Sequence, residues 1–224
     1  MTSVFDALGA KAAAMVPDGA VVGLGSGRAA EAFLRALAER VRSGLGVRGV
    51  ATSNATAQLA ERLGIPLVPL PDEPLALTVD GADEVDPRLD LIKGYGGALV
   101  RERIVAAASR QQVILVGEEK LVPVLGTRGR LPIEVIPMAV PLVRRRLEAL
   151  GLLTSLRRGA DGRDYVTDNG GRILDATIGP LSDPRGLDQA IRAVPGVVDT
   201  GLFLGTADLV LVGSPGGIRE LRRA

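Results

Sequence analysis

Short apolar runs and helical patterns alternate along the first half of the chain. After an N-terminal helix predicted over residues 5–16, runs with the length and composition of buried strands recur at residues 20–24, 49–51, 65–70, 75–79 and 113–117. The segments between them carry apolar residues at helical spacing, as Phe33, Leu37 and Val41 do. Strands that alternate with helices predict an α/β fold with a mostly parallel sheet.

The order of elements changes after about residue 127. A strand over 133–136 and a helix precede the segment DYVTDNGGRILDATI, which predicts a hairpin around Asn169 and Gly170. LDQAIRAV then predicts a second helix, so we expect a smaller α+β domain over residues 127–200. VLVG as a last strand and GGIRELRR as a last helix return to the larger domain, which comprises residues 1–126 and 201–224.

Composition excludes several classes of protein. The chain has 224 residues, of which 46% are hydrophobic and 24% charged, as in ordinary globular proteins. Its 27 cations nearly balance 26 anions and only 2% of its residues are aromatic, so nucleic acid is not an expected partner. No apolar run approaches the roughly 18 residues of a membrane span, and no signal-peptide pattern is present. We therefore expect a cytoplasmic protein with no membrane partner.

Two missing residue types restrict the chemistry further. The chain has no cysteine and no histidine, which excludes a thiolate nucleophile, a disulfide and a sulfur-ligated metal. Proton transfer near neutral pH must then use a carboxylate, a lysine or a tyrosine. Any metal site would consist of oxygen ligands, which favour magnesium, calcium or manganese over zinc.

The segment from Thr78 to Val105, TVDGADEVDPRLDLIKGYGGALVRERIV, concentrates carboxylates, a lysine and a glycine-rich turn. The apolar run 75–79 predicts a short buried strand, which Asp80 and Gly81 end with turn chemistry. The glycine-rich turn at 94–97 then leads into a helix. Chemistry is expected in this segment.

That helix is predicted to present Val100, Ile104 and Ala107 on one apolar face. Glu102 lies roughly 200° around the helix from Val100 and is expected to point away from this face. In open α/β sheets, ligands bind beyond the carboxyl ends of the strands. The strand end, the turn and the helix would gather four side chains around one such crevice: Asp80, Asp83, Lys93 and Glu102.

The two kinds of cation are used very unequally. Arginine supplies 24 of the 27 cations, and only Lys11, Lys93 and Lys120 are lysine. A lysine inside a glycine-rich acidic segment therefore indicates that a compact ammonium is needed there. Lys120, just beyond the strand at 113–117, lies on the same side of the sheet. The structural alternative remains open: Asp80 and Asp83 could cap a turn, Lys93 could neutralise them, and Glu102 could be an acid favoured by the helix dipole.

Two loops carry candidate phosphate ligands. GLGSGRAAE lacks the full glycine pattern of a dinucleotide-binding turn, but its backbone N–H groups and the following helix suit a phosphate, with Ser26, Gly27 and Arg28 as ligands. A plain tight turn is the alternative. Thr52, Ser53 and Asn54 begin the next helix, and they either cap it or also face the crevice.

With these residues identified, the sequence resembles the ribose-5-phosphate isomerase type A family over essentially its whole length. The matching stretches are GLGSG, TSNAT, VDGADEVDPRLDLIKGYGGALVRERI, KLVPVLG, LPIEVIPMA, YVTDNGGRILD and PGVVDTGLF. The resemblance implies a Rossmann-like domain with a small ferredoxin-like domain, and a homodimer or homotetramer. It also implies interconversion of ribose 5-phosphate and ribulose 5-phosphate with no metal and no cofactor.

Carried over by position, Glu102 corresponds to the proton-transferring base, and Lys93 to the lysine beside the carbonyl oxygen. Asp80 and Asp83 match aspartates near the ring-opening end of the sugar, and Lys120 matches a substrate-contacting lysine. The resemblance further implies substrate contacts at Ser26, Gly27, Arg28, Ala29, Gly81, Ala82, Gly94, Tyr95 and Gly96.

The phosphate loop departs from the family pattern. Two hydroxyl residues are replaced by Arg28 and Ala29, and lysines of the N-terminal helix by Phe5 and Asp6. We hypothesise that the Arg28 guanidinium supplies the missing charge, because its fork geometry suits phosphate oxygens.

Two other functions compete with isomerisation. A magnesium-dependent phosphohydrolase or nucleotide-binding protein would use four acids as ligands, but Lys93 would repel the ion. These acids are Asp80, Asp83, Glu84 and Asp86. Activity that survives EDTA would exclude this alternative. A non-catalytic sugar-phosphate sensor could share the fold, but it would not need a proton-transferring group such as Glu102.

Overall fold

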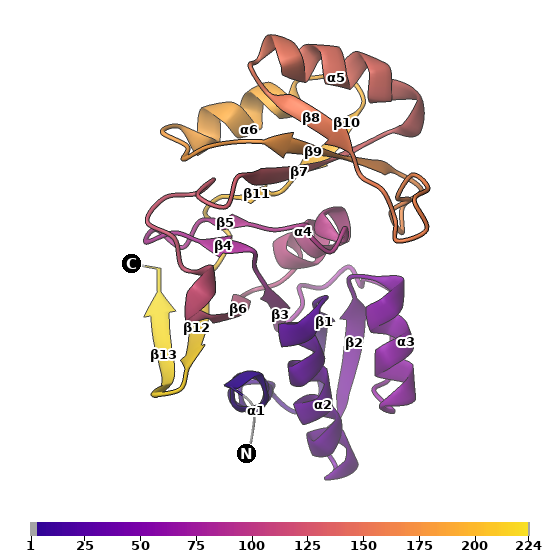
Figure 1. Ribbon diagram of the computed structural model, residues 1–224. Coiled ribbons are helices and arrows are strands. Elements are labelled where there is room, and N and C mark those ends of the chain that lie inside the picture. The colour runs from indigo at the N-terminus through magenta and orange to yellow at the C-terminus, as the bar shows by residue number, and fades with distance from the viewer. Residues whose placement is uncertain (1–3, 224) are drawn as a thin grey trace.

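The computed structural model describes residues 4–223, which form six α-helices and three β-sheets (Figure 1). The helices are α1 (Val4–Ala14), α2 (Arg28–Arg42), α3 (Asn54–Arg62), α4 (Leu99–Ala107), α5 (Val140–Ala149) and α6 (Pro184–Arg192). Two short 3₁₀ helices are η1 (Glu118–Lys120) and η2 (Pro137–Ala139). No helix among residues 4–223 is long and apolar enough to cross a membrane.

The largest sheet has six strands in the order β13-β12-β6-β3-β1-β2. Its strands are β1 (Ala20–Leu24), β2 (Val47–Ala51), β3 (Leu77–Gly81), β6 (Gln112–Gly117), β12 (Leu209–Ser214) and β13 (Gly217–Arg222). All neighbours pair in parallel except β12 and β13. The chain adds β2 on one side of β1 and β3 on the other, so the strand order reverses between β1 and β3. Ligands bind at such a reversal in open α/β sheets.

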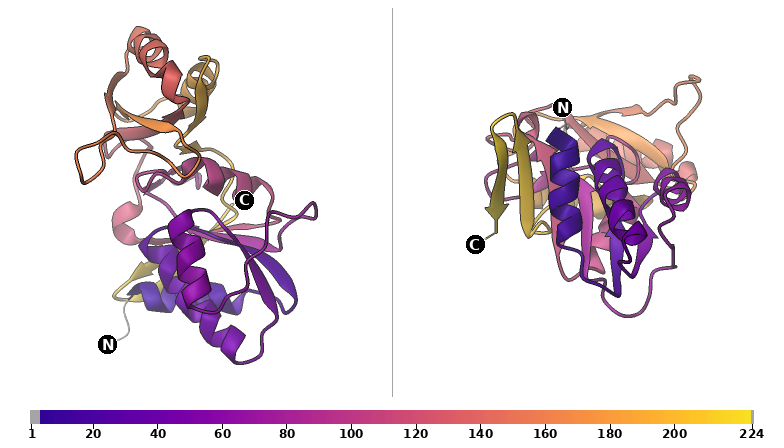
Figure 2. Two further views of the ribbon diagram at one scale, coloured as in Figure 1. Left: turned by 90° about the vertical axis from the view of Figure 1, so that its right-hand side faces the viewer. Right: turned by 90° about the horizontal axis from the view of Figure 1, so that it is seen from below.

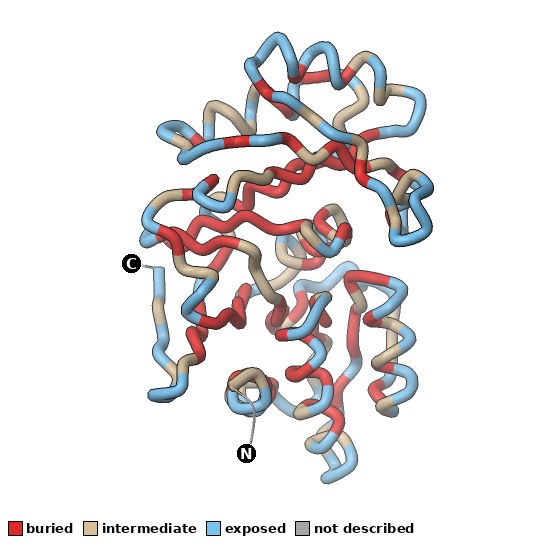
Figure 3. The backbone as a smooth tube through the Cα atoms, in the orientation of Figure 1, coloured by how far each residue is buried: buried red, intermediate tan, exposed pale blue. Residues whose placement is uncertain are grey.

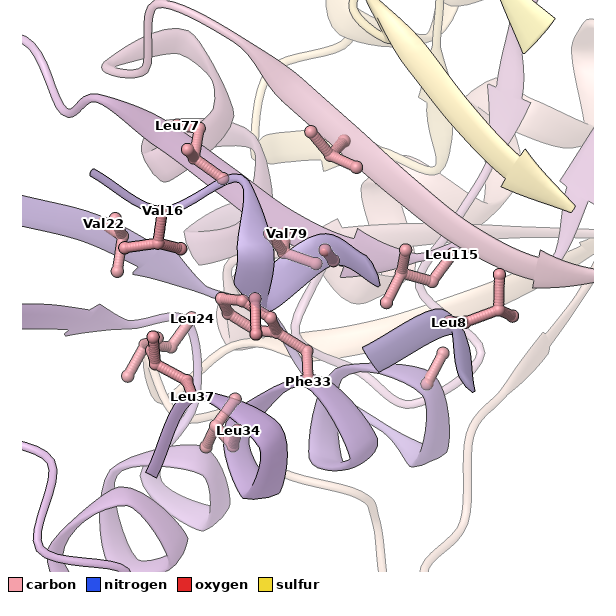
Figure 4. Close-up of a cluster of buried hydrophobic side chains, with 14 of the residues drawn as sticks. Leu8, Val16, Val22, Leu24, Phe33, Leu34, Leu37, Leu77, Val79 and Leu115 are labelled. Carbon is pink, nitrogen blue, oxygen red and sulfur yellow. The ribbon is translucent and has the colours of Figure 1, made fainter. Parts of the chain in front are cut away.

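Alternation along the strands divides the core of this sheet into two layers. Val113 and Leu115 of β6 pack with α1 and α2, whereas Ile114 and Val116 pack on the opposite face with Leu99 of α4. Figure 4 shows the first layer, in which side chains of α1 and α2 are directed toward the sheet: Leu8, Phe33, Leu34 and Leu37 against Val22, Leu24, Val79 and Leu115. The view from below in Figure 2 places α1, α2 and α3 side by side.

The second sheet has four antiparallel strands in the order β10-β7-β9-β8. They are β7 (Arg130–Val135), β8 (Leu153–Leu156), β9 (Arg172–Thr177) and β10 (Val197–Thr200), with α5 after β7 and α6 after β9. The resulting order βαββαβ is the ferredoxin-like arrangement, and the predicted fold class is confirmed.

A third, small antiparallel sheet lies between the two larger ones (Figure 1). It contains β4 (Glu84–Val85), β5 (Leu91–Ile92) and β11 (Leu202–Phe203), and all six residues are buried. Figure 3 shows this central region mostly in red, whereas α5 at the outside of the second sheet is mostly exposed. The lysine predicted to act in the site follows directly after β5, and it therefore starts from a fully enclosed strand.

Three predicted elements are wrong. Residues 65–70 form no strand, because Pro66 and Pro69 lack the N–H donors of a ladder, and only Leu67 bridges to Gly49. The predicted last helix is strand β13, which forms a hairpin with β12 through Ser214 and Gly217.

Two apolar residues of β13 explain that error. Ile218 packs against the α1 and α2 layer, and Leu221 against the opposite layer. A spacing of three suggests one face of a helix, but in a strand it places two residues on opposite faces.

The hairpin expected around Asn169 and Gly170 is also wrong, because only the turn exists there. The Gly170 N–H donates to the Thr167 carbonyl at 2.9 Å, but the strand before β9 is β8, far upstream. Arg157, which continues the path of β8, donates its N–H to the Ile173 carbonyl. Strand β8 and Arg157 therefore occupy the edge of β9 with which residues 164–168 would have to pair in the predicted hairpin.

The α2 layer makes a strong stability prediction. Leu37 is fully buried, so Leu37→Ala should lower the free energy of unfolding by about 2–5 kcal/mol through lost contacts and a cavity. Leu70 is 42% exposed, and the matched change Leu70→Ala should cost about 0.5 kcal/mol or less. Urea unfolding of both variants measures the difference, and equal losses would contradict the assigned packing.

Candidate active site

A cavity of about 190 Å³ opens where β1 and β3 end, at the predicted crevice. It is bounded by the loop after β1, by the segment after β3, by the glycine turn before α4 and by the end of β6. Its lining residues are Phe5, Ser26, Gly27, Arg28, Ala29, Gly81, Ala82, Asp83, Lys93, Gly94, Gly96, Glu102, Leu115, Val116, Gly117 and Lys120.

A buried lysine lies between two carboxylates beside this cavity. Lys93 Nζ is 3.0 Å from Asp80 Oδ2 and 3.2 Å from Glu102 Oε2, and it donates to the Gly81 carbonyl at 2.5 Å. The three side chains are between 3% and 7% exposed. Burial alone would lower the pKa of Lys93, but the charges of Asp80 and Glu102 outweigh it and raise that pKa above its ordinary value. The ammonium is therefore held in its charged form.

Strand alternation places Asp80 on the face of the sheet that α4 covers. Its Oδ1 accepts hydrogen bonds from the backbone N–H groups of Ser26 at 3.0 Å and Gly81 at 2.8 Å. Gly25 makes this position possible, because a Cβ there would lie 2.4 Å from the Asp80 carboxyl carbon. Both oxygens of Asp80 are thus engaged, and Asp80 does not line the cavity, whereas its partner Lys93 does.

Glu102 is placed differently from the helical prediction. The apolar face expected at Val100, Ile104 and Ala107 is wrong: Ile104 is 49% exposed, and the buried face of α4 is Leu99, Glu102 and Val105. The acid replaces an apolar residue on the inner face because Lys93 opposes its charge. Glu102 therefore points into the protein and toward the cavity.

The surroundings of Glu102 favour its protonated form. Burial, together with the negative charge of Asp80, raises the pKa of the Glu102 carboxyl to about 8, against the opposing effect of Lys93. Among the described residues, none forms a geometrically regular hydrogen bond to Glu102 Oε2, although the Lys93 ammonium lies 3.2 Å away. This oxygen is buried, and its main partner is the charge of Lys93.

Asp83 connects the glycine turn with Lys120. Its Oδ2 accepts the Tyr95 N–H at 2.9 Å, and its Oδ1 lies 4.0 Å from Lys120 Nζ. Burial raises the pKa of Asp83, while the Tyr95 N–H and the Lys93 charge oppose the rise. Asp83 and Lys120 both line the cavity, so they present an anion and a cation to a ligand.

The glycine turn needs its glycines for two separate reasons. Gly94 and Gly97 have φ of 101° and 89°, which L side chains rarely adopt. A Cβ at Gly97 would also lie 2.3 Å from the Tyr165 hydroxyl oxygen. The turn thereby brings its backbone close to the second sheet while Gly94 and Gly96 line the cavity.

The loop between β1 and α2 has the features of an anion site. Gly27, with φ of 84°, occupies the N-cap position of α2, and no side chain among the described residues caps this helix. The first N–H groups of α2 are therefore available to an anion. The Arg28 guanidinium lies over the Phe5 ring at 4.4 Å, at the edge of the same cavity.

The hydroxyl of Ser26 faces a cluster of other hydroxyls. Its Oγ lies 2.9 Å from the hydroxyl oxygens of Thr52 and Ser53 and 3.2 Å from that of Thr56. Ser53 also caps α3, because its Oγ accepts the Thr56 N–H at 3.0 Å. Capping is therefore confirmed for Ser53, and the cluster additionally fixes the loop around Ser26.

The remaining acids of the central segment hold the backbone. Glu84 accepts the N–H groups of Gly126 and Arg128, both at 2.7 Å, and Asp86 accepts that of Asp90. Among residues 4–223, no three acids are grouped as ligands for a metal ion. Glu84 and Asp86 therefore lack the arrangement that the magnesium alternative needs.

The sequence model of the family ribose 5-phosphate isomerase A (phosphoriboisomerase A) matches residues 48–217 of this chain. The chain belongs to the ribose 5-phosphate isomerase A family. Ribose-5-phosphate isomerase A of Thermomicrobium roseum is 51% identical over 216 residues, which cover 95% of this chain and 91% of that protein.

Solved structures of ribose 5-phosphate isomerases agree in fold. The enzyme of Methanocaldococcus jannaschii superimposes with a TM-score of 0.93 at 39% identity, covering 98% of each chain. A D-ribose-5-phosphate isomerase in complex with phospho-erythronic acid superimposes with a TM-score of 0.92 at 36% identity, again covering 98% of each.

Most of the site residues that the sequence predicts lie together in the structure. Ser26, Gly27, Arg28, Ala29, Gly81, Ala82, Asp83, Lys93, Gly94, Gly96, Glu102 and Lys120 all line the cavity. Asp80 and Tyr95 do not. Asp80 is paired with Lys93. The Tyr95 hydroxyl donates to the Arg130 carbonyl, and the Tyr95 ring stacks under the Arg130 guanidinium at 4.7 Å. Only the Tyr95 N–H acts near the cavity, through Asp83.

Sequence reasoning missed several parts of the site. Leu115, Val116 and Gly117 line the cavity from the end of β6. Their apolar run identified a strand, but nothing in it indicated which strand ends would face the ligand. Gly25 was visible as part of GLGSG, and its contact with Asp80 becomes evident only in three dimensions.

The unequal environments of the two carboxylates predict a measurable titration. In protein labelled with ¹³C at glutamate side chains, the Glu102 carboxyl should titrate near pH 8. Because the Asp80 charge raises this pKa, Asp80→Asn should lower it; because Lys93 lowers it, Lys93→Met should raise it. NMR titration of the three proteins checks both signs, and an unchanged Glu102 pKa in Asp80→Asn would contradict the coupling.

Proposed function

We propose that this protein interconverts D-ribose 5-phosphate and D-ribulose 5-phosphate through an enediolate. The observation that carries the proposal is a buried carboxylate of raised pKa, Glu102, 3.2 Å from the Lys93 ammonium in a cavity that also holds an uncapped helix N-terminus. Membership of the isomerase family and the sugar-acid phosphate held by a related enzyme support a phosphorylated sugar as the ligand.

Glu102 moves the proton. In the open-chain aldose, its ionised carboxyl takes the proton from C2, the electrons of the C–H bond form the C1–C2 double bond, and the C1=O π electrons move to O1 to give the enediolate. The proton of the O2 hydroxyl passes to O1, the C2=O bond forms, and the electrons of the C1–C2 double bond take back the proton of Glu102 at C1 to give the ketose. One carboxyl group serves both steps if it lies over the C1–C2 edge, and a pKa near 8 suits both the base and the acid form.

Lys93 stabilises the charge that develops on the oxygens. Its ammonium lines the cavity, while Asp80 and the Gly81 carbonyl fix it from behind. A fixed cation in a buried site costs no reorganisation when the enediolate forms. Asp80 does not line the cavity but is paired with Lys93, which does, so we propose that it assists ring opening through that ammonium and not by direct contact with the sugar.

The other lining residues bind the rest of the substrate. Asp83 and Lys120 are placed to hold sugar hydroxyls. The phosphate group is assigned to the loop of Ser26, Gly27, Arg28 and Ala29, whose backbone N–H groups and helix end favour an anion.

We propose that residues 1–126 and 201–224 form the catalytic domain and residues 127–200 the smaller one. Every residue lining the cavity falls between Phe5 and Lys120, which supports this division.

Glu102→Gln tests the assignment of the base. Ketose formation from ribose 5-phosphate, followed by absorbance in the presence of EDTA, should show kcat lower by about 10² to 10⁴, because the amide cannot accept the C2 proton. Glu39→Gln, at a 72% exposed side chain on α2, is the matched control and should behave as wild type. Near-normal turnover by Glu102→Gln would remove Glu102 from this role, and no ketose from the wild-type protein would refute the function.

Arg28→Ala tests the phosphate loop. Loss of a charge-assisted hydrogen bond to phosphate should raise KM for ribose 5-phosphate about tenfold or more, whereas kcat should change little. Arg28→Lys distinguishes the guanidinium fork from charge alone. Arg42→Ala, at the far end of α2, is the control. An unchanged KM in Arg28→Ala would show that the backbone suffices for phosphate binding.

We propose that the protein is a homodimer or homotetramer. Ile136 and Met138, 51% and 90% exposed, follow β7, and Val198, 43% exposed, lies in the adjacent β10. Exposed apolar side chains of this kind mark interaction surfaces. Light scattering should give a mass of two or four chains, and Met138→Asp should lower it if this surface forms the interface.

A further inference from the structure

Four sequence motifs contain residues that the proposed reaction leaves without a role, and these residues meet beside α4. Asn54 belongs to TSNAT, Arg101 to VRERI, Glu134 to LPIEV, and Asp168 and Asn169 to YVTDNGG. They come from α3, α4, β7 and the turn before β9, far apart along the chain. Hydrogen bonds join all of them into one network.

Arg101 is the centre of this network. Its Nε donates to Asn169 Oδ1 at 2.9 Å, its Nη1 to Asn54 Oδ1 at 3.0 Å and its Nη2 to the Asp168 carbonyl at 2.6 Å. One planar guanidinium thus connects α4 both to α3 and to the turn before β9. A lysine ammonium has three donors on one nitrogen and lacks the planar fork by which three separate nitrogens of Arg101 reach these acceptors.

The turn that receives Arg101 is itself held from two sides. Glu134 Oε1 accepts from the Thr167 hydroxyl at 2.7 Å and from Asn169 Nδ2 at 3.1 Å. Asp168 Oδ2 accepts the Asn54 N–H at the start of α3, at 2.7 Å. Arg101 therefore binds to a fixed support, although the Arg101 side chain itself is 33% exposed.

Helix α4 depends on such support because its own packing is sparse. No side chain among the described residues caps it, and only Leu99 and Val105 supply buried apolar side chains. On the other side of Glu102, Arg103 pairs with Asp199 and donates to the Thr200 and Leu202 carbonyls. Of the two residues that flank Glu102, Arg101 is therefore tied to α3 and to the turn before β9, and Arg103 to β10 and β11.

We propose that Arg101 is a positioning residue of this isomerase: by holding α4 to Asn54 and to the turn at Asp168 and Asn169, it fixes the Glu102 carboxyl over the reacting carbons. This inference rests on the proposed function, because it assigns Arg101 a role through Glu102. Substrate binding does not depend on it, since Arg101 does not line the cavity. Its removal should therefore impair the chemical step and leave binding nearly intact.

Steady-state kinetics with ribose 5-phosphate tests the proposal. In Arg101→Ala, kcat should fall between about 10-fold and 10²-fold, as expected for a slightly displaced catalytic group, with KM within about threefold of wild type. Arg101→Lys should recover part of the loss. Arg110→Ala, at an exposed arginine three residues beyond α4, is the matched control and should keep wild-type kcat. The melting temperature of each variant shows whether the fold is retained.

A double-mutant cycle separates positioning from general weakening. Asn169→Ala should lower kcat by itself, and adding it to Arg101→Ala should cost little more, because both changes break one contact. Three results would each overturn the proposal: wild-type kcat in Arg101→Ala, additive losses of kcat in the cycle, or a raised KM with unchanged kcat. If Arg101→Ala does not fold, Asn54→Ala and Asn169→Ala each remove one acceptor, and wild-type kcat in both would overturn it. Absence of ketose with wild-type protein and Arg110→Ala would instead refute the proposed function.

Discussion

One buried ammonium between two buried carboxylates is the interaction on which the site depends. A single positive charge cannot fully compensate Asp80 and Glu102, so one carboxylate must bear the deficit. Asp80 receives two backbone N–H groups, whereas Glu102 Oε2 receives no hydrogen bond from the described residues. Burial and the negative charge of Asp80 together raise the pKa of the Glu102 carboxyl, against the opposing charge of Lys93. In a chain without histidine, this arrangement supplies a group that titrates near neutral pH.

The architecture delivers these three groups from separate elements. Alternation in β3 directs Asp80 to the α4 side of the sheet, the enclosed strand β5 delivers Lys93, and α4 turns Glu102 inward. The Lys93 backbone is fixed as well, because its N–H donates to the Gly201 carbonyl at 2.9 Å. Segments before and after the second sheet thus hold the same lysine, which couples the two parts of the molecule at the site.

Local patterns predicted much of this arrangement. The expected strand end, glycine turn and helix predicted that four side chains lie together: Asp80, Asp83, Lys93 and Glu102. The face of α4 could not be predicted from apolar spacing, because Glu102 is buried by its ion pair and not by hydrophobicity. Helical spacing misled in the same way for β13, whose two apolar residues serve opposite layers.

Contacts between distant residues were beyond sequence reasoning. The pairing of Arg101 with Asn169, 68 positions later, and the contact between Gly25 and Asp80 are properties of the assembled sheets. Motifs indicated that these residues matter, but they did not show what the residues touch. The predictions that failed concern residues whose position depends on a contact with a distant part of the chain.

Strand β13 closes one side of the large sheet and also creates a free edge. Such an edge offers unpaired N–H and C=O groups to any other strand it meets. Here the edge carries Arg219, Glu220 and Arg222, all exposed. Charged side chains on an edge strand disfavour its pairing with another strand, so the hairpin of β12 and β13 discourages uncontrolled sheet extension and fibril growth while it completes the core.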